Sequence, residues 1–371
     1  MMSFLRCKPA VFVVGSSYEF LFNLNAYGLC YVQIGDAIYH EECTGVLPSE
    51  RLTVKIRVPQ TVLDEAKGYT VLYRATQERK SYFSTFQPME TQSFAFRPLT
   101  KTEDIHIYHI ADVHYHFDEA KKMASYFGND TDLFVFNGDI GEVETEENFL
   151  EVCDLVGEIA QGEIPVLFVR GNHDTRGRLA ELYPKYFPVE KGKTYFSFEI
   201  GCLNGVVLDC GEDKPDNHRE YDASESVPEA LRGGNRFHAY REEETAFLKQ
   251  TSLNTQEKIP FAVSHICPER VASVAGGPFD IERDIYRQWI AELERMQIRF
   301  LLSGHFHTAY VMHKGDERSF LPHEYPVVVG SVCTREGKLQ GAAITLNKRS
   351  MIVRITDAEH QVIQTHEIVF A

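Results

Sequence analysis

The hydrophobic pattern of the chain changes character at about residue 100. Before that point, short segments rich in β-branched and aromatic residues, many of them alternating with polar residues, are separated by turn residues. These segments span residues 11–14, 18–22, 30–34, 52–58 and 69–74. They predict an N-terminal all-β domain over residues 1–100, built as a small β-sandwich. Residues 96–101 are expected to link it to the rest of the chain.

From residue 105 onward, apolar strands alternate with helical segments. Strands are expected at 105–110, 133–136, 166–169, 261–263 and 300–302, and helices at 118–127, 145–160 and 281–296. This alternation predicts an α/β fold over residues 101–371, with a buried sheet and ligands at the carboxyl ends of its strands. Alternating segments at 342–346, 351–356 and 362–370 predict antiparallel strands that complete a second sheet. Residues 210–240 are polar and irregular, which is typical of a functional or disordered loop.

Composition restricts the partners that the protein can have. The chain has 371 residues, a net charge of −16 and 43% hydrophobic residues, which is the composition of a globular, acidic protein. So acidic a surface does not favour nucleic acid or an anionic membrane as a partner. The sequence shows no signal-peptide pattern and no membrane-spanning stretch, and its eight cysteines have no CxxC spacing. We therefore expect a cytoplasmic protein with reduced thiols.

Five short polar stretches follow one another along the α/β part, most of them just after an apolar strand. They contain Asp112 and His114, Gly138 and Asp139, Gly171 to Asp174, a lone His265, and Gly304 with His305 and His307. Side chains two residues apart on a strand point the same way, so Asp112 and His114 can bind one ion. Asp139 has two carboxylate oxygens and can therefore bridge two ions. Such oxygen and imidazole ligands suit a pair of divalent metals, the kind of site that phosphoester hydrolysis uses.

The order of these stretches, D-x-H, G-D, G-N-H-D, a lone His and G-H-x-H, resembles the calcineurin-like metallophosphoesterase superfamily. The resemblance covers roughly residues 105–307. It implies a four-layer α/β/β/α sandwich for the second domain. It also implies a first metal bound by Asp112, His114 and His307, a bridging Asp139, and a second metal bound by Asn172, His265 and His305.

The same resemblance assigns roles to residues that do not bind metal. It implies that His173 protonates the leaving oxygen or stabilises the phosphoryl charge, for which a pKa near neutrality is suited. Glu142 is expected to orient His173, and Asp174 is the second candidate for that role. Arg176 is expected to bind the substrate phosphate, and the alternative is an ordinary ion pair. Residues Asp213 and Lys214 are candidates for a lid over the pocket.

The stretches Gly171–Gly177 and Gly211–Asp216 resemble a bacterial subgroup of these proteins that has a fibronectin-like N-terminal domain, and the N-terminal part is similar to the β-domain of purple acid phosphatases. Two positions differ from the latter enzymes, which have Gly where His114 stands and a Tyr ligand at the position of Glu142. These differences argue against a Tyr–Fe(III) centre.

The sequence therefore predicts a hydrolase for a small phosphodiester or phosphomonoester, with two divalent ions and attack by a metal-bound hydroxide. Ligands of nitrogen and oxygen without thiolate favour Mn, Fe or Zn. The alternative is a metal-binding scaffold of the same fold that has lost catalysis. The natural substrate, the ester type and the oligomeric state stay open.

Overall fold

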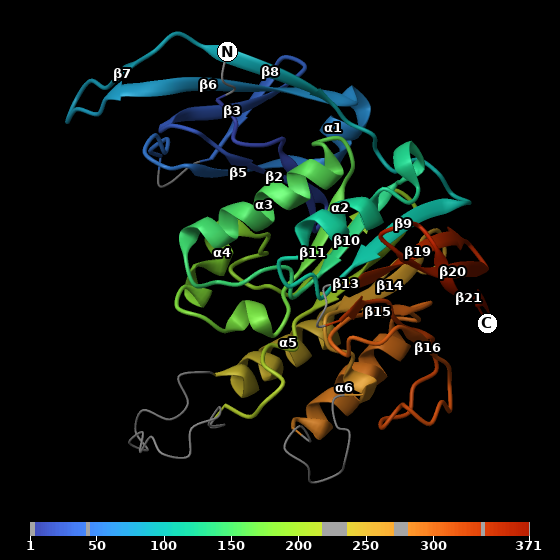
Figure 1. Ribbon diagram of the computed structural model, residues 1–371. Helices are drawn as coiled ribbons and strands as arrows, with labels where there is room; N and C mark the ends of the chain where they lie inside the picture. Colours follow the sequence, from blue (N-terminus) through green and yellow to red (C-terminus); the bar gives the residue numbers. More distant parts are fainter. Residues whose placement is uncertain (1–3, 42–44, 217–235, 271–280, 335–337, 371) are drawn as a thin grey trace, which may run out of the picture.

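The computed structural model describes residues 4–41, 45–216, 236–270, 281–334 and 338–370 (Figure 1). Its largest sheet has ten strands, and at its centre β9, β10, β11 and β1 run parallel. These four strands are almost wholly apolar, as strands covered on both faces are. The path of the sheet is β21 (Val362–Val369), β20 (Ser350–Asp357), β19 (Leu339–Asn347), β9 (Ile105–Ile110), β10 (Leu133–Asn137), β11 (Val166–Val169), β1 (Ala10–Val14), β2 (Ser17–Asn23) and β5 (Thr53–Pro59), with β18 (Val332–Cys333) on β19.

A second sheet of six strands packs against the first, with helices on the two outer faces (Figure 1). Its order is β12 (Phe196–Ile200), β13 (Leu203–Leu208), β14 (Ile259–Ser264), β15 (Leu301–Ser303), β17 (Val327–Val329) and β16 (Tyr310–Met312). Helices α2 (Phe117–Ala124) and α3 (Glu146–Ala160) cover the first sheet, whereas α5 (Phe237–Gln250) and α6 (Arg283–Arg295) cover the second. This arrangement confirms the predicted α/β/β/α sandwich.

The N-terminal strands contribute to two sheets. A five-stranded sheet contains β4 (Ala37–His40), β3 (Gly28–Ile34), β6 (Gly68–Glu78), β7 (Thr85–Phe86) and β8 (Glu90–Ala95). It faces the outer end of the ten-stranded sheet, where the Phe20 ring of β2 meets the Tyr69 ring of β6 at 4.6 Å between centroids. A short helix, α1 (Gln60–Ala66), lies between β5 and β6. The predicted β-sandwich is therefore present, but one of its two sheets continues into the α/β part. That residues 1–100 form a separate domain stays a prediction.

Most predicted helices form within a few residues of their expected ends. Helix α3 begins after a capping box, in which Thr145 and Asn148 each accept a hydrogen bond from the backbone N–H of the other. Residues 217–235 of the segment predicted as irregular lie outside the described part. The end of that segment is helical, because α5 begins at Phe237. Its pattern is hidden in the sequence, because Arg241 and Glu244 occupy buried positions on its inner side. The remaining helical turns within the described ranges are α4 (Tyr183–Tyr186) and four short 3₁₀ segments at Gly128–Asp130, His173–Thr175, Ala180–Leu182 and Pro268–Arg270.

One buried amide joins the two central sheets at the strand ends. Asn137, the last residue of β10, donates through Nδ2 to the carbonyls of Ser264 and Leu302 on the other sheet, at 3.3 Å each. The same nitrogen donates to Nε2 of His109 at 3.0 Å. Burial lowers the pKa of His109 to about 3, so that its ring is neutral and can accept this bond. The side chain of Asn137 thus connects the two sheets by hydrogen bonds next to the loops that carry the predicted ligands.

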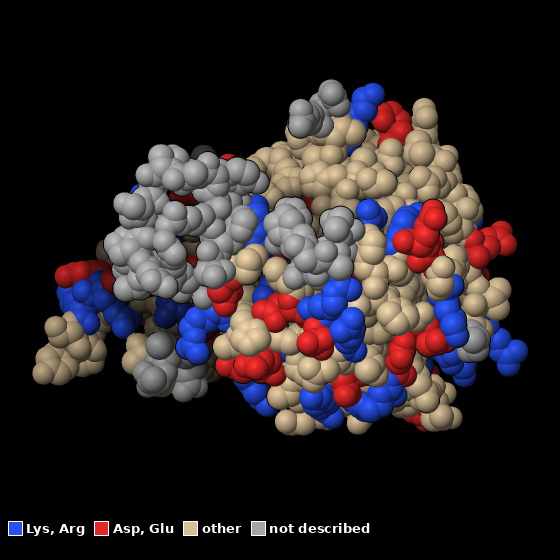
Figure 2. Space-filling model, turned by 90° about the horizontal axis from the view of Figure 1, so that it is seen from below, with Lys and Arg blue, Asp and Glu red and all other residues tan. Residues whose placement is uncertain are grey.

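The surface that carries α5 and α6 has mixed charge. In Figure 2, blue and red residues are interspersed over the described part of this face. A face of this kind does not produce a field of one sign that would attract a polyanion. Within the described ranges, no helix has both the length and the apolar character that crossing a bilayer requires.

Candidate functional site

The predicted ligands converge where five strands end. Loops after β9, β10 and β11 of one sheet and after β14 and β15 of the other carry them. The backbone turns sharply there, because five of these residues have left-handed φ angles of 45–71°, namely Asp112, His114, Asp139, His305 and His307. Residues other than glycine rarely adopt this conformation, and such strain gathers at functional sites.

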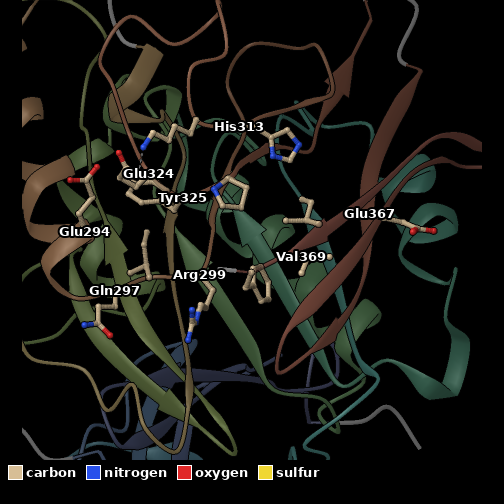
Figure 3. A pocket seen from close by; sticks show the side chains of 13 residues that line it. Glu294, Gln297, Arg299, His313, Glu324, Tyr325, Glu367 and Val369 are labelled. Carbon is tan, nitrogen blue, oxygen red and sulfur yellow. Dashed lines mark hydrogen bonds and ion pairs between the residues drawn. The ribbon is translucent and has the colours of Figure 1, made fainter.

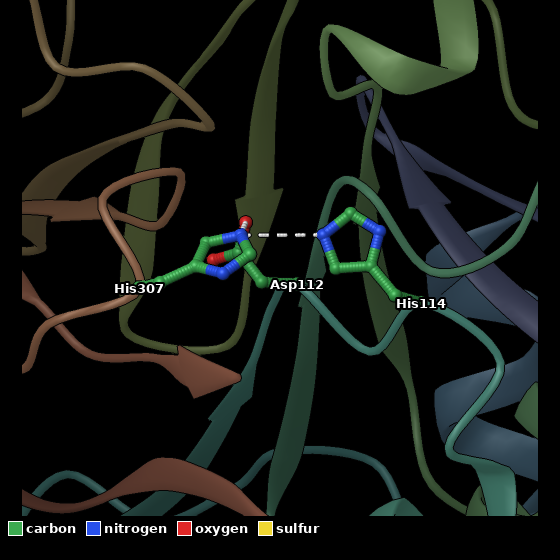
Figure 4. Close-up of side chains that lie close together, drawn as sticks. All are labelled: Asp112, His114 and His307. Carbon is green, nitrogen blue, oxygen red and sulfur yellow. Dashed lines mark hydrogen bonds and ion pairs between the residues drawn. The ribbon is translucent and has the colours of Figure 1, made fainter. Parts of the chain in front are cut away.

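The first group of candidate ligands is formed by Asp112, His114 and His307, whose ligand atoms all lie within 4.8 Å of one another (Figure 4). Nε2 of His307 is 3.3 Å from Nε2 of His114 and 3.5 Å from Oδ1 of Asp112. Residues from two distant parts of the sequence thus point at one position. This is the set that the sequence predicts for the first metal.

The second group contains Asp139, His265 and His305, again within 4.8 Å of one another. Oδ2 of Asp139 lies 3.2 Å from Nε2 of His265. Asn172 belongs with them, since its Oδ1 is 3.0 Å from Nδ1 of His305. Nε2 of His265 is also 3.8 Å from Oδ1 of Asp112, a member of the first group. The two groups are therefore adjacent, as a dinuclear site requires.

The unpaired atoms of the site show that this donor set fits cations. Oδ1 of Asp112 is buried and has no hydrogen-bond partner among the described residues. The side-chain amide of Asn172 lies within 3.3 Å of Nε2 of His265, Oδ2 of Asp139 and Nδ1 of His305, and its opposite orientation would donate to these three atoms and accept from Arg176. A buried carboxylate oxygen without a hydrogen-bond partner, as at Asp112, can be satisfied by a cation.

Buried charges in the site point to the same conclusion. Asp112 and Asp139 are fully buried, and burial acts to raise the pKa of each carboxyl group. The neighbouring histidines outweigh this effect and lower both pKa values; the main contributor is His307 at Asp112 and His265 at Asp139. Burial acts to lower the pKa of His265, but Asp139 and Asp112 raise it well above its ordinary value. Two carboxylates are thus offset by a protonated imidazole, which a divalent ion can replace.

Two hydrogen bonds, one of them from a residue outside the motifs, hold the side chain of Asp112 in place. Its Oδ2 accepts hydrogen bonds from the backbone N–H of His305, at 2.8 Å, and from the hydroxyl of Ser331. Sequence reasoning missed Ser331, because it lies far along the chain in no recognisable motif. The side chain of Asp112 is thereby held with Oδ1 free to face His307.

Glycine at position 171 is required by the close approach of two ligand loops. A Cβ atom at this position would lie 2.1 Å from Oδ1 and 2.5 Å from the backbone nitrogen of Asp139. The motif glycine therefore lets the loop after β11 pack directly on the predicted bridging carboxylate.

His173 lies beside both ligand groups, with its side chain exposed. Its exposed ring meets that of His114 at 5.0 Å between centroids, and its Nε2 is 4.0 Å from Oδ2 of Asp139. Its backbone N–H donates to Oδ1 of Asp139 at 2.9 Å. Nη1 of Arg176 is 3.3 Å from Nε2 of His173. The ring is thus placed next to the ligands without being directed into either group.

The structure corrects the roles predicted for Asp174 and Glu142. Asp174 is buried beneath the loops, where its Oδ2 accepts from the backbone N–H groups of Gly171 at 2.7 Å and Asp139 at 3.1 Å. It fixes the ligand loops rather than the His173 ring. Burial and the charge of Asp139 raise the pKa of Asp174 to about 7. The side chain of Glu142 is exposed, and no hydrogen bond or ion pair joins it to another described residue.

Arg176 lies beside His173, but its guanidinium is bound by acidic residues. Its Nε and Nη2 donate to the two oxygens of Glu212 at 2.6 Å each, and Nη2 donates to Oδ1 of Asp213 at 2.9 Å. Oδ2 of Asp213 is 3.8 Å from Nε2 of His305, and Lys214 is 3.2 Å from Asp213. Asp213 and Lys214 thus reach the site, as the lid hypothesis requires. Glu212 was missed, because no motif marks it.

A cavity of about 460 Å³ lies elsewhere, between α6, β16, β17 and β21 (Figure 3). Glu294, Arg299, His313 and Glu324 are among its lining residues. It contains none of the predicted ligands, so that it is separate from the candidate metal site.

Comparison with known proteins agrees with the fold and the motifs. The family described as calcineurin-like phosphoesterase matches residues 105–309, more than half of the chain. No curated protein sequence matches. Among solved structures, purple acid phosphatase PPD1 from yellow lupin (Lupinus luteus) seeds is similar with a TM-score of 0.62 at 10% identity, over 97% of this chain and 74% of that one. The structure of PhoD is similar with a TM-score of 0.56 at 12% identity, over 100% of this chain and 90% of that one.

Both structural similarities include the N-terminal strands, and at such low identity they show the fold alone. The family match covers all the predicted ligands and His173. This chain belongs to the calcineurin-like phosphoesterase family.

Proposed function

We propose that the protein is a dinuclear metal-dependent phosphoesterase that hydrolyses a small phosphate ester. The observation that supports this most strongly is the convergence of two ligand groups, one around Asp112 and one around Asp139, at one edge of the two sheets. Family membership supports a phosphoesterase in general. The nitrogen and oxygen donors favour Mn, Fe or Zn as the ions.

In this proposal, different residues of the site have different roles in the reaction. Divalent ions bound there supply Lewis acidity and lower the pKa of water. Asp139 would bridge the two ions, and Asn172, beside His305, would offer a neutral oxygen to the second one. His173, exposed next to Asp139, is positioned to give a proton to the leaving oxygen. Asp174 and Gly171 hold the loops in register, so that these groups need little rearrangement.

A catalytically silent scaffold of the same fold is the alternative. Loss of ligands or of His173 would favour it, but all seven predicted ligands and His173 are present at the converging strand ends. The acidic composition supports a small soluble substrate over a nucleic acid.

Metal-stripped protein reloaded separately with Mn, Zn, Fe(II) or Mg would test the proposal. The substrates are bis(p-nitrophenyl) phosphate and p-nitrophenyl phosphate. We expect that at least one metal restores turnover of at least one ester. Absence of turnover under every metal, with two ions bound per chain, would contradict the proposal and favour the scaffold.

A further inference from the structure

A compact cluster of four charged residues lies beside the second ligand group. Among the described residues, Arg176 and Lys214 contribute two positive charges to it, and Glu212 and Asp213 contribute two negative ones. Arg176 binds both oxygens of Glu212 in a two-point geometry and also contacts Asp213. Lys214 is buried and lies 3.2 Å from Asp213 and 3.7 Å from Glu212. Such charge-assisted, two-point bonds are among the strongest that Arg forms.

Hydrogen bonds from α5 hold the backbone at Glu212. The buried guanidinium of Arg241, on α5, donates to the carbonyl of Cys210 at 2.6 and 2.9 Å and to the carbonyl of Glu212 at 2.5 Å. The backbone N–H of Gly211 donates to Asp209 at 2.8 Å. Moving the backbone at Glu212 would break buried bonds of a guanidinium, which is strongly unfavourable. The backbone that carries Glu212 is therefore held in place beside Arg176.

This cluster faces the place where a phosphate would sit. Nη1 of Arg176 is 3.3 Å from His173, and Oδ2 of Asp213 is 3.8 Å from Nε2 of His305. An arginine in this position would ordinarily stabilise the charge of a bound phosphoryl group. Here its charge is already offset by Glu212, and the carboxylate of Asp213 adds a negative charge on the same side.

We propose that Glu212 and Asp213 neutralise Arg176 and thereby make the site selective for phosphodiesters over phosphomonoesters. The proposal rests on the proposed function. A diester carries one negative charge at neutral pH, whereas a monoester carries nearly two. The extra charge of the monoester gains little from a neutralised arginine and is repelled by Asp213. Glu212 and Asp213 are thus specificity-determining residues that act through Arg176.

The test compares methyl p-nitrophenyl phosphate with p-nitrophenyl phosphate, which share a leaving group and differ in charge by one methylation. We expect the wild-type metal-loaded protein to have the higher kcat/KM for the diester. Glu212→Gln should keep the shape of the side chain but release the charge of Arg176. The diester-to-monoester ratio of kcat/KM should then fall about tenfold, equivalent to about 1.4 kcal/mol, through a gain on the monoester.

Further variants separate this role from a structural one. Asp213→Asn should shift the ratio in the same direction, and it serves if Glu212→Gln does not fold. Adding Arg176→Ala to Glu212→Gln should remove the gain on the monoester. Glu190→Gln is the matched control, because Glu190 pairs with Arg57 away from the ligand loops and its loss should leave the ratio unchanged.

The outcomes distinguish the two proposals. Turnover of neither ester by the wild-type protein under any metal would contradict the proposed function itself. Turnover with a wild-type preference for the monoester would overturn only the selectivity role. An unchanged ratio in folded Glu212→Gln and Asp213→Asn would do the same.

Discussion

The buried amide of Asn137 offers a direct test of how the site is held together. Its Nδ2 donates to two carbonyls of the opposite sheet and to His109, and the residue is fully buried. The backbone carbonyl of Asn137 also accepts from Nδ1 of His265 at 2.6 Å. Asn137→Ala removes the three side-chain bonds but keeps the bond to His265.

The expected loss of stability follows from these contacts. The Nδ2 group has two hydrogens to share among its three acceptors, and a typical buried hydrogen bond contributes about 1 kcal/mol net, so the expected loss is about 2 kcal/mol in the free energy of unfolding. Asn204→Ala is the matched control, because Asn204 is also a buried asparagine but its Nδ2 donates only to the carbonyl of Asn254. The same arithmetic gives about 1 kcal/mol for the control.

Urea unfolding of metal-stripped protein at neutral pH would measure both values without a contribution from bound ions. We expect Asn137→Ala to lose roughly 1 kcal/mol more than Asn204→Ala. Equal losses in the two variants would refute the view that this amide fastens the sheets together.

Four further predictions concern the site and one buried acid. Asp139→Asn should abolish turnover and reduce the number of bound metal ions, as measured by elemental analysis; full activity would contradict its bridging role. His173→Ala should retain both ions but lower kcat by about a hundredfold or more, because a general acid is lost; an unchanged kcat would remove His173 from the mechanism. Gly171→Ala should lower metal affinity, since its Cβ would meet Asp139 at 2.1 Å; wild-type affinity in a titration would refute this. Burial raises the pKa of Glu269 from its ordinary 4.5 to about 7. The protonated group therefore stabilises the fold below about pH 4.5, and this contribution is lost as the pH rises toward 7. Between these pH values, the unfolding free energy of Glu269→Gln should rise relative to wild type by about 3 kcal/mol, and parallel pH profiles would contradict the assignment.

The position of the metal ligands could be predicted from the sequence because it depends on local features. Each ligand follows an apolar strand within a few residues, and the ends of parallel strands meet at one edge of a sheet. The direction of Asp174 could not be predicted, because the 3₁₀ turn at His173–Thr175 sends neighbouring side chains to opposite sides. The partner of Arg176 was equally hidden, since Glu212 reaches it only through tertiary folding.

The N-terminal strands show a second limit of sequence reasoning. The sequence pattern places residues 11–14 in the N-terminal β-sandwich. In the structure they form β1, which pairs in parallel with β11 of the central sheet. Their unbroken apolar run is typical of a strand buried on both faces, and this was the available signal. Which neighbour such a strand pairs with is decided by long-range packing, and the local pattern carries no information about it.

The number of metal ions at which activity saturates tests the central claim most directly. Metal-stripped protein would be titrated with Mn(II), following bound metal and ester hydrolysis in the same samples. The account predicts that turnover reaches its maximum at two ions per chain. Maximal turnover with a single ion, or turnover that is independent of added metal in fully stripped protein, would contradict it.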